Sequence, residues 1–150
     1  MARAFEDHCW RDIVSEETLR VYEPYQREVF VGDRPALLAI DLYNLAYRGG
    51  AKEPHELIKE HPSSCGRYAW EAIANTEMLF SAARAAKLPI IYTTAPYSSA
   101  VVATNRQVGS GSDEDDFQIY KAFEPHENDL VIVKERASGF YGTPLLVELN

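Results

Sequence analysis

The chain has 150 residues, of which 46% are hydrophobic, and this length and composition suit one folded domain with a sizeable core. Its formal net charge of −8 argues against nucleic acid and anionic membranes as partners. No apolar run approaches the length of a membrane span, and the amino-terminal segment lacks a signal-peptide core. The only cysteines, Cys9 and Cys65, have neither metal-binding nor redox spacing, which is typical of a cytoplasmic protein with reduced thiols.

Residues 1–34 show no strong periodicity, so we interpret them as an amino-terminal extension or arm that precedes the amino-terminal part of a single domain, residues 35–150. Within the extension, residues 15–20 suggest a helical turn. Residues 22–30 are aromatic and charged. Two interpretations stay open for them: an ordinary packed extension, or an arm that contacts another subunit.

Three short apolar runs, at residues 36–41, 90–94 and 129–134, have the pattern of strands that are buried on both faces of a parallel sheet. With helices between and after them, they predict an α/β fold with a parallel sheet and right-handed crossovers. Three strands are fewer than the ~5–6 of an average sheet. We therefore expect the sheet to be incomplete within these residues.

A long helix is predicted over residues 66–87, because apolar side chains recur there at three- and four-residue steps. Ser63 or Ser64 is expected to cap it, and Pro89 to end it. Two shorter helices are predicted, over residues 55–61 and over residues 145–149.

Residues 109–116 form a polar, acidic segment that lacks the spacing of an EF-hand loop. We interpret this segment as a solvated loop, with a cation site as the alternative. The four histidines are scattered along the chain and are interpreted as surface residues: His8, His55, His61 and His126.

Two of the predicted strands end on charges of opposite sign, Asp41 after the first and Lys134 after the third. Open α/β sheets bind ligands at the carboxyl ends of their strands. We therefore expect these two strands to be neighbours, with the two charged side chains within ion-pair reach.

Three known uses of an aspartate at such a position do not fit. A haloacid-dehalogenase-type phosphatase needs a second aspartate two residues later, where Tyr43 stands. A response-regulator receiver needs a phospho-acceptor aspartate at the end of a middle strand, where Thr93 and Thr94 stand. A phosphate-binding loop needs glycines after the first strand, and residues 41–45 contain none.

A fourth use fits. Residues 35–44, PALLAIDLYN, resemble the first motif of the isochorismatase-like cysteine hydrolases, and residues 88–94, LPIIYTT, are similar to their second strand. Residues 129–145, DLVIVKERASGFYGTPL, resemble the lysine motif of this family. The resemblance covers residues 35–150, is closest to the N-carbamoylsarcosine amidase branch, and implies the three-layer α-β-α, Rossmann-like isochorismatase-type fold.

The resemblance implies a catalytic triad of Asp, Lys and Cys, in which Asp41 matches the general base and Lys134 matches the lysine. A thiol is a poor nucleophile until it is deprotonated, a carboxylate can accept its proton, and a nearby ammonium favours the thiolate. The implied reaction is hydrolysis of a small amide or carbamoyl compound through an acyl-enzyme.

The family's cysteine follows a further strand, but residues 135–150 contain no cysteine. Cys9 and Cys65 do not match that motif and are interpreted as inert. We therefore expect the chain to be the amino-terminal part of an amidohydrolase whose cysteine lies beyond residue 150, or on a separate chain. The alternative is a truncated, non-catalytic binding or assembly module.

The resemblance also implies that Asn44 and Phe140 flank the substrate. Asn44 has the alternative role of bracing its loop, and Phe140 that of a core aromatic. Residues 94–99 offer no strong ligand for the metal that related nicotinamidases bind, so we expect no metal and no cofactor. The expected partners are a small-molecule amide substrate and further copies of the chain in a homo-oligomer.

Overall fold

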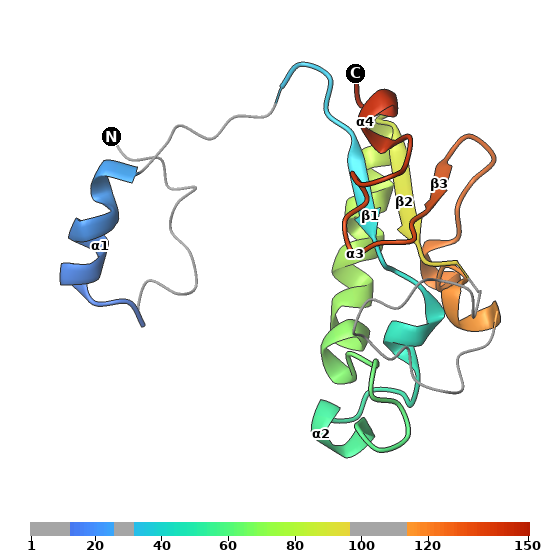
Figure 1. Cartoon of the computed structure of the whole chain (residues 1–150), viewed down its shortest axis with the longest axis horizontal. Coiled ribbons are helices and arrows are strands. Elements are labelled where there is room, and N and C mark those ends of the chain that lie inside the picture. The colour runs from blue at the N-terminus through green and yellow to red at the C-terminus, as the bar shows by residue number, and fades with distance from the viewer. Residues whose placement is uncertain (1–12, 26–31, 97–113) are drawn as a thin grey trace. The chain divides into compact units, whose positions relative to one another are not determined.

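The computed structural model describes residues 13–25, 32–96 and 114–150, and the chain divides into a smaller unit, residues 1–33, and a larger unit, residues 34–150 (Figure 1). The smaller unit contains helix α1 (Glu16–Tyr22), whose capping residue Ser15 accepts a hydrogen bond from the backbone N–H of Thr18, and the 3₁₀ helix η2 (Glu23–Tyr25). The helical turn predicted there is confirmed. Residues 26–30 of the expected arm lie outside the described residues.

The larger unit contains a parallel sheet of three strands: β1 (Leu37–Ile40), β2 (Ile90–Thr94) and β3 (Leu130–Val133). The predicted strands and their parallel arrangement are confirmed. The strand order is β1-β2-β3, so the expectation that the first and third strands are neighbours is wrong. Every residue of β2 is buried, whereas Ile40 and Val133 at the ends of the outer strands are exposed. β2 lies in the centre of the described sheet, where both of its edges are paired, and this accounts for the burial of all its residues.

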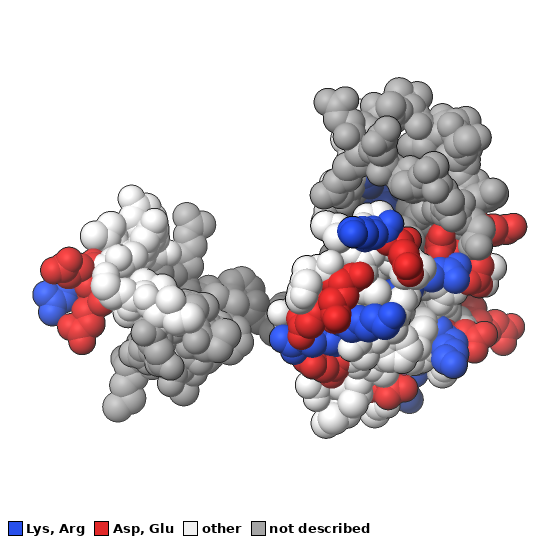
Figure 2. Space-filling view, turned by 90° about the horizontal axis from the view of Figure 1, so that it is seen from below, with Lys and Arg blue, Asp and Glu red and all other residues white. Residues whose placement is uncertain are grey.

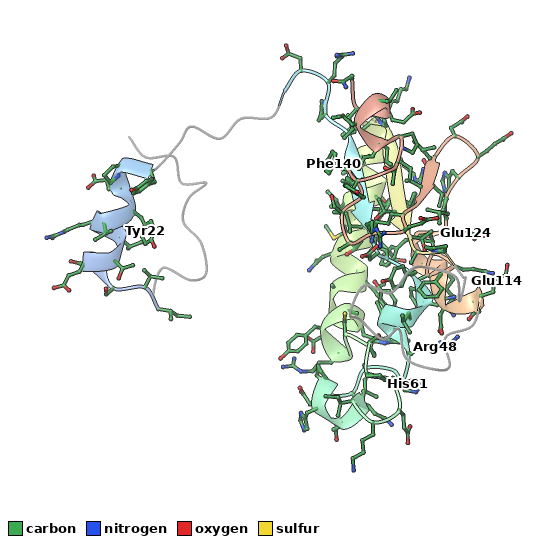
Figure 3. All side chains as sticks on the ribbon, viewed as in Figure 1. Tyr22, Arg48, His61, Glu114, Glu124 and Phe140 are labelled. Carbon is green, nitrogen blue, oxygen red and sulfur yellow. The ribbon has the colours of Figure 1, made fainter. Side chains whose placement is uncertain are left out.

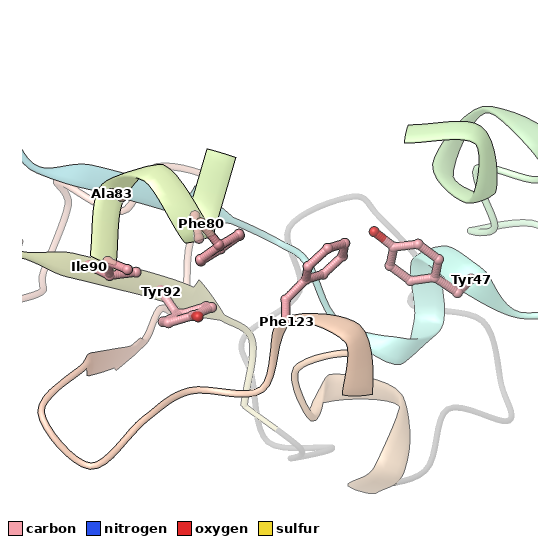
Figure 4. Close-up of a cluster of buried hydrophobic side chains, with 7 residues drawn as sticks. Tyr47, Phe80, Ala83, Ile90, Tyr92 and Phe123 are labelled. Atoms are coloured by element: carbon pink, nitrogen blue, oxygen red, sulfur yellow. The ribbon is translucent and has the colours of Figure 1, made fainter. Parts of the chain in front are cut away.

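Helices pack on both faces of the sheet, which gives the predicted three layers. Alternate strand residues point to opposite faces. On one face, α3 (Arg67–Ala85) places Phe80 and Ala83 against β1 and β2, and on the other α4 (Leu145–Glu148) places the fully buried Leu145 against β2 and β3. The first cluster comprises Ala39, Tyr47, Phe80, Ala83, Ile90, Tyr92 and Phe123 (Figure 4).

Helix α3 agrees with the predicted range, but its capping residue is Gly66 rather than a serine. Gly66 has a φ of 54°, and a Cβ there would lie 2.5 Å from the carbonyl oxygen of Lys52, so the close approach requires glycine. Ser64 instead donates a hydrogen bond to the carbonyl oxygen of Arg48 at 2.6 Å and accepts one from the Gly66 N–H. Its hydroxyl thus ties the start of the helix to the loop after β1.

Short helices lie in the chain segments between the strands. They are η3 (Asn44–Tyr47), α2 (Pro54–Leu57), η4 (Glu114–Phe117) and η5 (Lys121–Phe123). Tyr47 stacks on Tyr120 with 4.1 Å between ring centroids, and Phe123 lies between Phe80 and Tyr47 (Figure 4). Burial, with smaller contributions from Cys65 and Tyr120, raises the pKa of Tyr47 to about 12. This aromatic cluster extends the core from the sheet to the loops that carry the candidate site.

The surface is mixed in charge. On the face of the larger unit that Figure 2 shows, Lys and Arg side chains lie among Asp and Glu side chains. Among the described residues, no helix has the length and apolar character needed to span a membrane.

Candidate functional site

Asp41 directly follows β1, and its backbone is held in an unusual conformation. Its N–H donates a hydrogen bond to the carbonyl oxygen of Thr93 at 3.2 Å, which continues the β1–β2 pairing by one residue. Its φ is 57°, in the left-handed region that few residues other than glycine, asparagine and aspartate enter. Its side chain is 37% exposed, so the carboxylate is open to solvent at the carboxyl edge of the sheet.

Lys134 directly follows β3, and its side chain reaches across the end of β2 to Asp41. Its Nζ lies 3.0 Å from Oδ1 and 3.2 Å from Oδ2 of Asp41, and only 7% of the side chain is exposed. Because neighbouring strands are ~4.8 Å apart, two strands separated by a third can be bridged only by a long side chain. The predicted ion pair is confirmed, although the strands that carry it are not adjacent.

Thr93 lies between the two charges, and sequence reasoning missed it as a site residue. It pairs in register with Ile40 and with Ile132, and it is 1% exposed. Its hydroxyl donates to Oδ1 of Asp41 at 3.4 Å. A threonine near the end of an otherwise apolar strand was the sequence feature that could have indicated this role. Its position beside the ion pair, however, follows only from the strand order.

The loop after Lys134 packs closely on Thr93. A Cβ on Gly139 would lie 3.3 Å from Cγ2 of Thr93 and 3.2 Å from Cδ2 of Leu145, so this loop approaches the sheet where a side chain would crowd it. The next residue, Phe140, is 55% exposed (Figure 3). The interpretation of Phe140 as a core aromatic is therefore wrong, and its contact with a substrate stays a prediction.

Asn44 braces the loop that follows Asp41. Its Nδ2 donates to the carbonyl oxygen of Asp115 at 2.9 Å and to Oδ1 of the same residue at 3.3 Å. Its backbone N–H donates to the carbonyl oxygen of Gln118 at 2.9 Å. The bracing alternative thus has direct contacts, and the substrate-binding role of Asn44 stays a prediction.

The acidic segment is not simply solvated. Asp116 is 4% exposed, and its Oδ1 lies 2.6 Å from Nε of Arg48, whose Nη2 lies 3.2 Å from Oδ2 of Asp115. The interpretation as a solvated loop is therefore wrong for Asp116, because tertiary pairing buries its carboxylate. Residues 109–113 of the segment lie outside the described residues. In the described ranges, no three His, Cys, Asp or Glu side chains gather as a metal site.

The cysteines and histidines are the remaining candidates for a functional role. Cys65 is a free, exposed thiol ahead of α3, and its N–H donates to the carbonyl oxygen of Ala46. His55 and His126 are exposed as predicted, and His61 is half-buried. The other cysteine, Cys9, and the fourth histidine, His8, lie outside the described residues.

A known amidase is similar in sequence to much of this chain. The chain is 31% identical over 138 residues to an N-carbamoylsarcosine amidase of an Arthrobacter species, and the match covers 81% of this chain but 46% of that protein. The chain therefore spans about half the length of this curated relative.

Solved structures agree in fold. An isochorismatase family protein from Desulfovibrio vulgaris has a TM-score of 0.61 at 22% identity, over 76% of this chain and 59% of that chain. One from Burkholderia thailandensis has a TM-score of 0.55 at 28% identity, over 76% and 56%. The family model described as the isochorismatase domain matches residues 35–150, the span that contains the sheet and both charged strand ends. The chain belongs to the isochorismatase domain family.

Proposed function

We propose that this chain is the amino-terminal part of a cysteine-dependent amidohydrolase that acts on a small amide or carbamoyl compound. The observation that carries the proposal is the Asp41–Lys134 pair, in which the lysine is buried and the carboxylate faces solvent at the sheet's carboxyl edge. The similarity to an N-carbamoylsarcosine amidase supports this class of substrate.

In the proposed mechanism, Asp41 is the general base and Lys134 orients it. The ammonium of Lys134 contacts both carboxylate oxygens, and such charge-assisted hydrogen bonds are short and strong. A cysteine thiol, supplied by a segment beyond residue 150, gives its proton to Asp41 and attacks the carbonyl carbon as thiolate. Backbone N–H groups beside that cysteine are proposed to stabilise the oxyanion.

Collapse of the tetrahedral intermediate breaks the C–N bond, and Asp41 returns its proton to the departing ammonia. Water then attacks the thioester while Asp41 accepts a proton, which releases the acid and regenerates the thiolate. Phe140 is proposed to line the substrate pocket, because its exposed ring follows the loop that packs on Thr93. The complete enzyme is proposed to act as a homo-oligomer.

The test is Asp41→Asn in the complete protein. Asparagine tolerates the left-handed φ of this position, so the backbone is preserved while the base is removed. Ammonia release from amide and carbamoyl substrates should fall by ~10²–10⁴-fold. The variant should still fold, with a lower melting temperature, because the buried ammonium of Lys134 loses its charged partner. Asp33→Asn, at an exposed position of the smaller unit, is the matched control and should keep full activity.

Near-normal turnover of a well-folded Asp41→Asn variant would contradict the mechanism. A wild-type protein that is not inhibited by thiol alkylation would contradict the cysteine nucleophile. A complete protein without amidase activity would favour the alternative, a non-catalytic binding or assembly module.

A further inference from the structure

We infer that the Arg48–Asp116 ion pair is a positioning device that holds the backbone around Asp41 and Lys134 in its reactive arrangement. The inference rests on the proposed function, in which Asp41 is the general base. Neither Arg48 nor Asp116 is assigned a catalytic role. They act through the short helix η4 and the chain segments bonded to it.

The residues that follow Asp41 are held in place by a segment distant in sequence. A residue with a φ of 57° keeps that conformation only where its surroundings hold it. Here the next segment of backbone is paired with residues 118–120: Tyr43 forms an antiparallel bridge with Ile119, and the N–H of Tyr120 donates to the carbonyl oxygen of Leu42 at 2.8 Å. The exit of the chain from Asp41 is therefore fixed by a segment that is distant in sequence.

That distant segment follows η4, and Arg48 bonds η4 through two carboxylates. Arg48, which is labelled in Figure 3, directly follows η3 and bonds Asp116 at 2.6 Å and Asp115 at 3.2 Å; both carboxylates belong to η4. The side chain of Asp116 is only 6% exposed. Breaking the pair either leaves the carboxylate of Asp116 as a desolvated charge or takes from Arg48 the more buried of its two aspartate partners in η4, so η4 should move.

Hydrogen bonds through Thr94 link η4 to Lys134. The hydroxyl of Thr94 donates to the carbonyl oxygen of Phe117 in η4, and the carbonyl oxygen of Thr94 accepts the N–H of Lys134 at 2.8 Å. The ring of Phe117 also packs edge-on against Tyr43, with 5.7 Å between centroids. Movement of η4 would therefore shift both the backbone that follows Asp41 and the backbone at Lys134.

The molecule contains a matched control. Arg84 and Asp129 form a second arginine–aspartate pair between distant segments, at 2.7 Å with the aspartate side chain 7% exposed. Asp129 immediately precedes β3, whereas Lys134 follows it, so this pair lies at the opposite end of that strand from the site. Breaking it should destabilise the protein without disturbing the site.

The experiment compares Asp116→Asn with Asp129→Asn in the complete protein, well below both melting temperatures. Both variants should melt earlier than wild type. Only Asp116→Asn should lower kcat, by about tenfold or more with KM nearly unchanged, because geometry needed in the transition state is lost. Hydrogen exchange at the amides of Asn44 and Tyr120 should accelerate in Asp116→Asn and not in Asp129→Asn.

Equal kcat values for the two variants, in an active enzyme, would overturn the inference and leave the proposed function standing. If wild type has no amidase activity, the proposed function fails. Unchanged hydrogen exchange in Asp116→Asn would separately overturn the structural coupling.

If Asp116→Asn does not fold, Arg48→Lys replaces it, because lysine keeps the charge but cannot contact both carboxylates with the planar fork of arginine. Wild-type kcat in Arg48→Lys would then count against the inference.

Discussion

The charges of the Asp41–Lys134 pair differ in their access to solvent. The lysine side chain is 7% exposed and the aspartate side chain 37%. The buried ammonium is fixed among packed residues, while the carboxylate that must exchange protons remains reachable. This division suits a pair in which one member orients and the other reacts.

This asymmetry predicts the behaviour of Lys134→Met, a substitution that keeps the length of the side chain and removes its charge. Because the carboxylate left behind is partly solvated, the free energy of unfolding should fall by less than the ~3–5 kcal/mol typical of breaking a fully buried pair. Urea unfolding measures this change. Amidase activity of the complete protein should nevertheless be lost, and an active variant would show that Asp41 needs no orienting charge.

At the residue scale, the two charged members of the site could be predicted because each ends an apolar run. Thr93 and Arg48 could not. The role of Thr93 depends on β2 lying between the other strands, and Arg48 meets Asp116 only after residues far apart in sequence come together. A pattern of single residues carries no information about such partners.

Among the elements, α3 is joined to the start of β3 by Arg84 and by Asp129, the residue just before the strand. Two guanidinium nitrogens of Arg84 donate to the two carboxylate oxygens, at 3.1 and 2.7 Å. The N–H of His126 donates to Oδ2 of Asp129 at 2.8 Å, and Arg84 also reaches the hydroxyl of Tyr92. The contact ties the helix layer to an outer strand of the sheet.

This contact predicts a pH dependence of stability. Burial favours a higher pKa for Asp129, but the hydrogen bonds from Arg84 and from the His126 N–H outweigh it and hold the pKa below its usual value. A lowered folded-state pKa contributes stability above the unfolded-state pKa of ~3.9 and loses it as the pH falls through the folded value.

The effect of Asp129→Asn on the free energy of unfolding should therefore be large at pH 6 and shrink below about pH 4, near the usual pKa of an aspartate. Urea unfolding of wild type and variant across this range measures it. Other carboxylates titrate in both proteins and cancel in the difference. A difference that is independent of pH would contradict the role assigned to this ion pair.

The element boundaries were more predictable than the arrangement of the elements. Strand positions agree closely with the apolar runs, and α3 follows its three- and four-residue period. The order of the strands was missed, since it depends on which run finds partners on both edges. The cap of α3 was missed because the positive φ of Gly66 is imposed by its close contact with Lys52.

Across the whole larger unit, apolar side chains stay exposed on the outer strands of the described sheet. Ile40 of β1 is 58% exposed, and Val131 and Val133 of β3 are 42% and 53% exposed. Strands at the edge of a sheet offer unpaired backbone groups that template further pairing. This surface leads to a prediction for residues 1–150 expressed alone.

That protein should self-associate or fold poorly, and analytical ultracentrifugation with thermal melting measures both properties. Val133→Lys should reduce association, because a charge on an edge strand opposes edge-to-edge pairing. A soluble monomer with a sharp, cooperative melt would contradict the prediction, and it would favour the non-catalytic module over the amidohydrolase.

The left-handed backbone of Asp41 limits which residues can replace it. Glutamate carries the same acid group, but it would place that group one methylene further from Lys134 and does not share aspartate's tolerance of a φ of 57°. Alanine would impose a similar backbone cost without supplying a base. Asparagine and glycine tolerate this backbone, but neither carries an acid, so a replacement that avoids backbone strain removes the general base and leaves the buried ammonium of Lys134 without its charged partner.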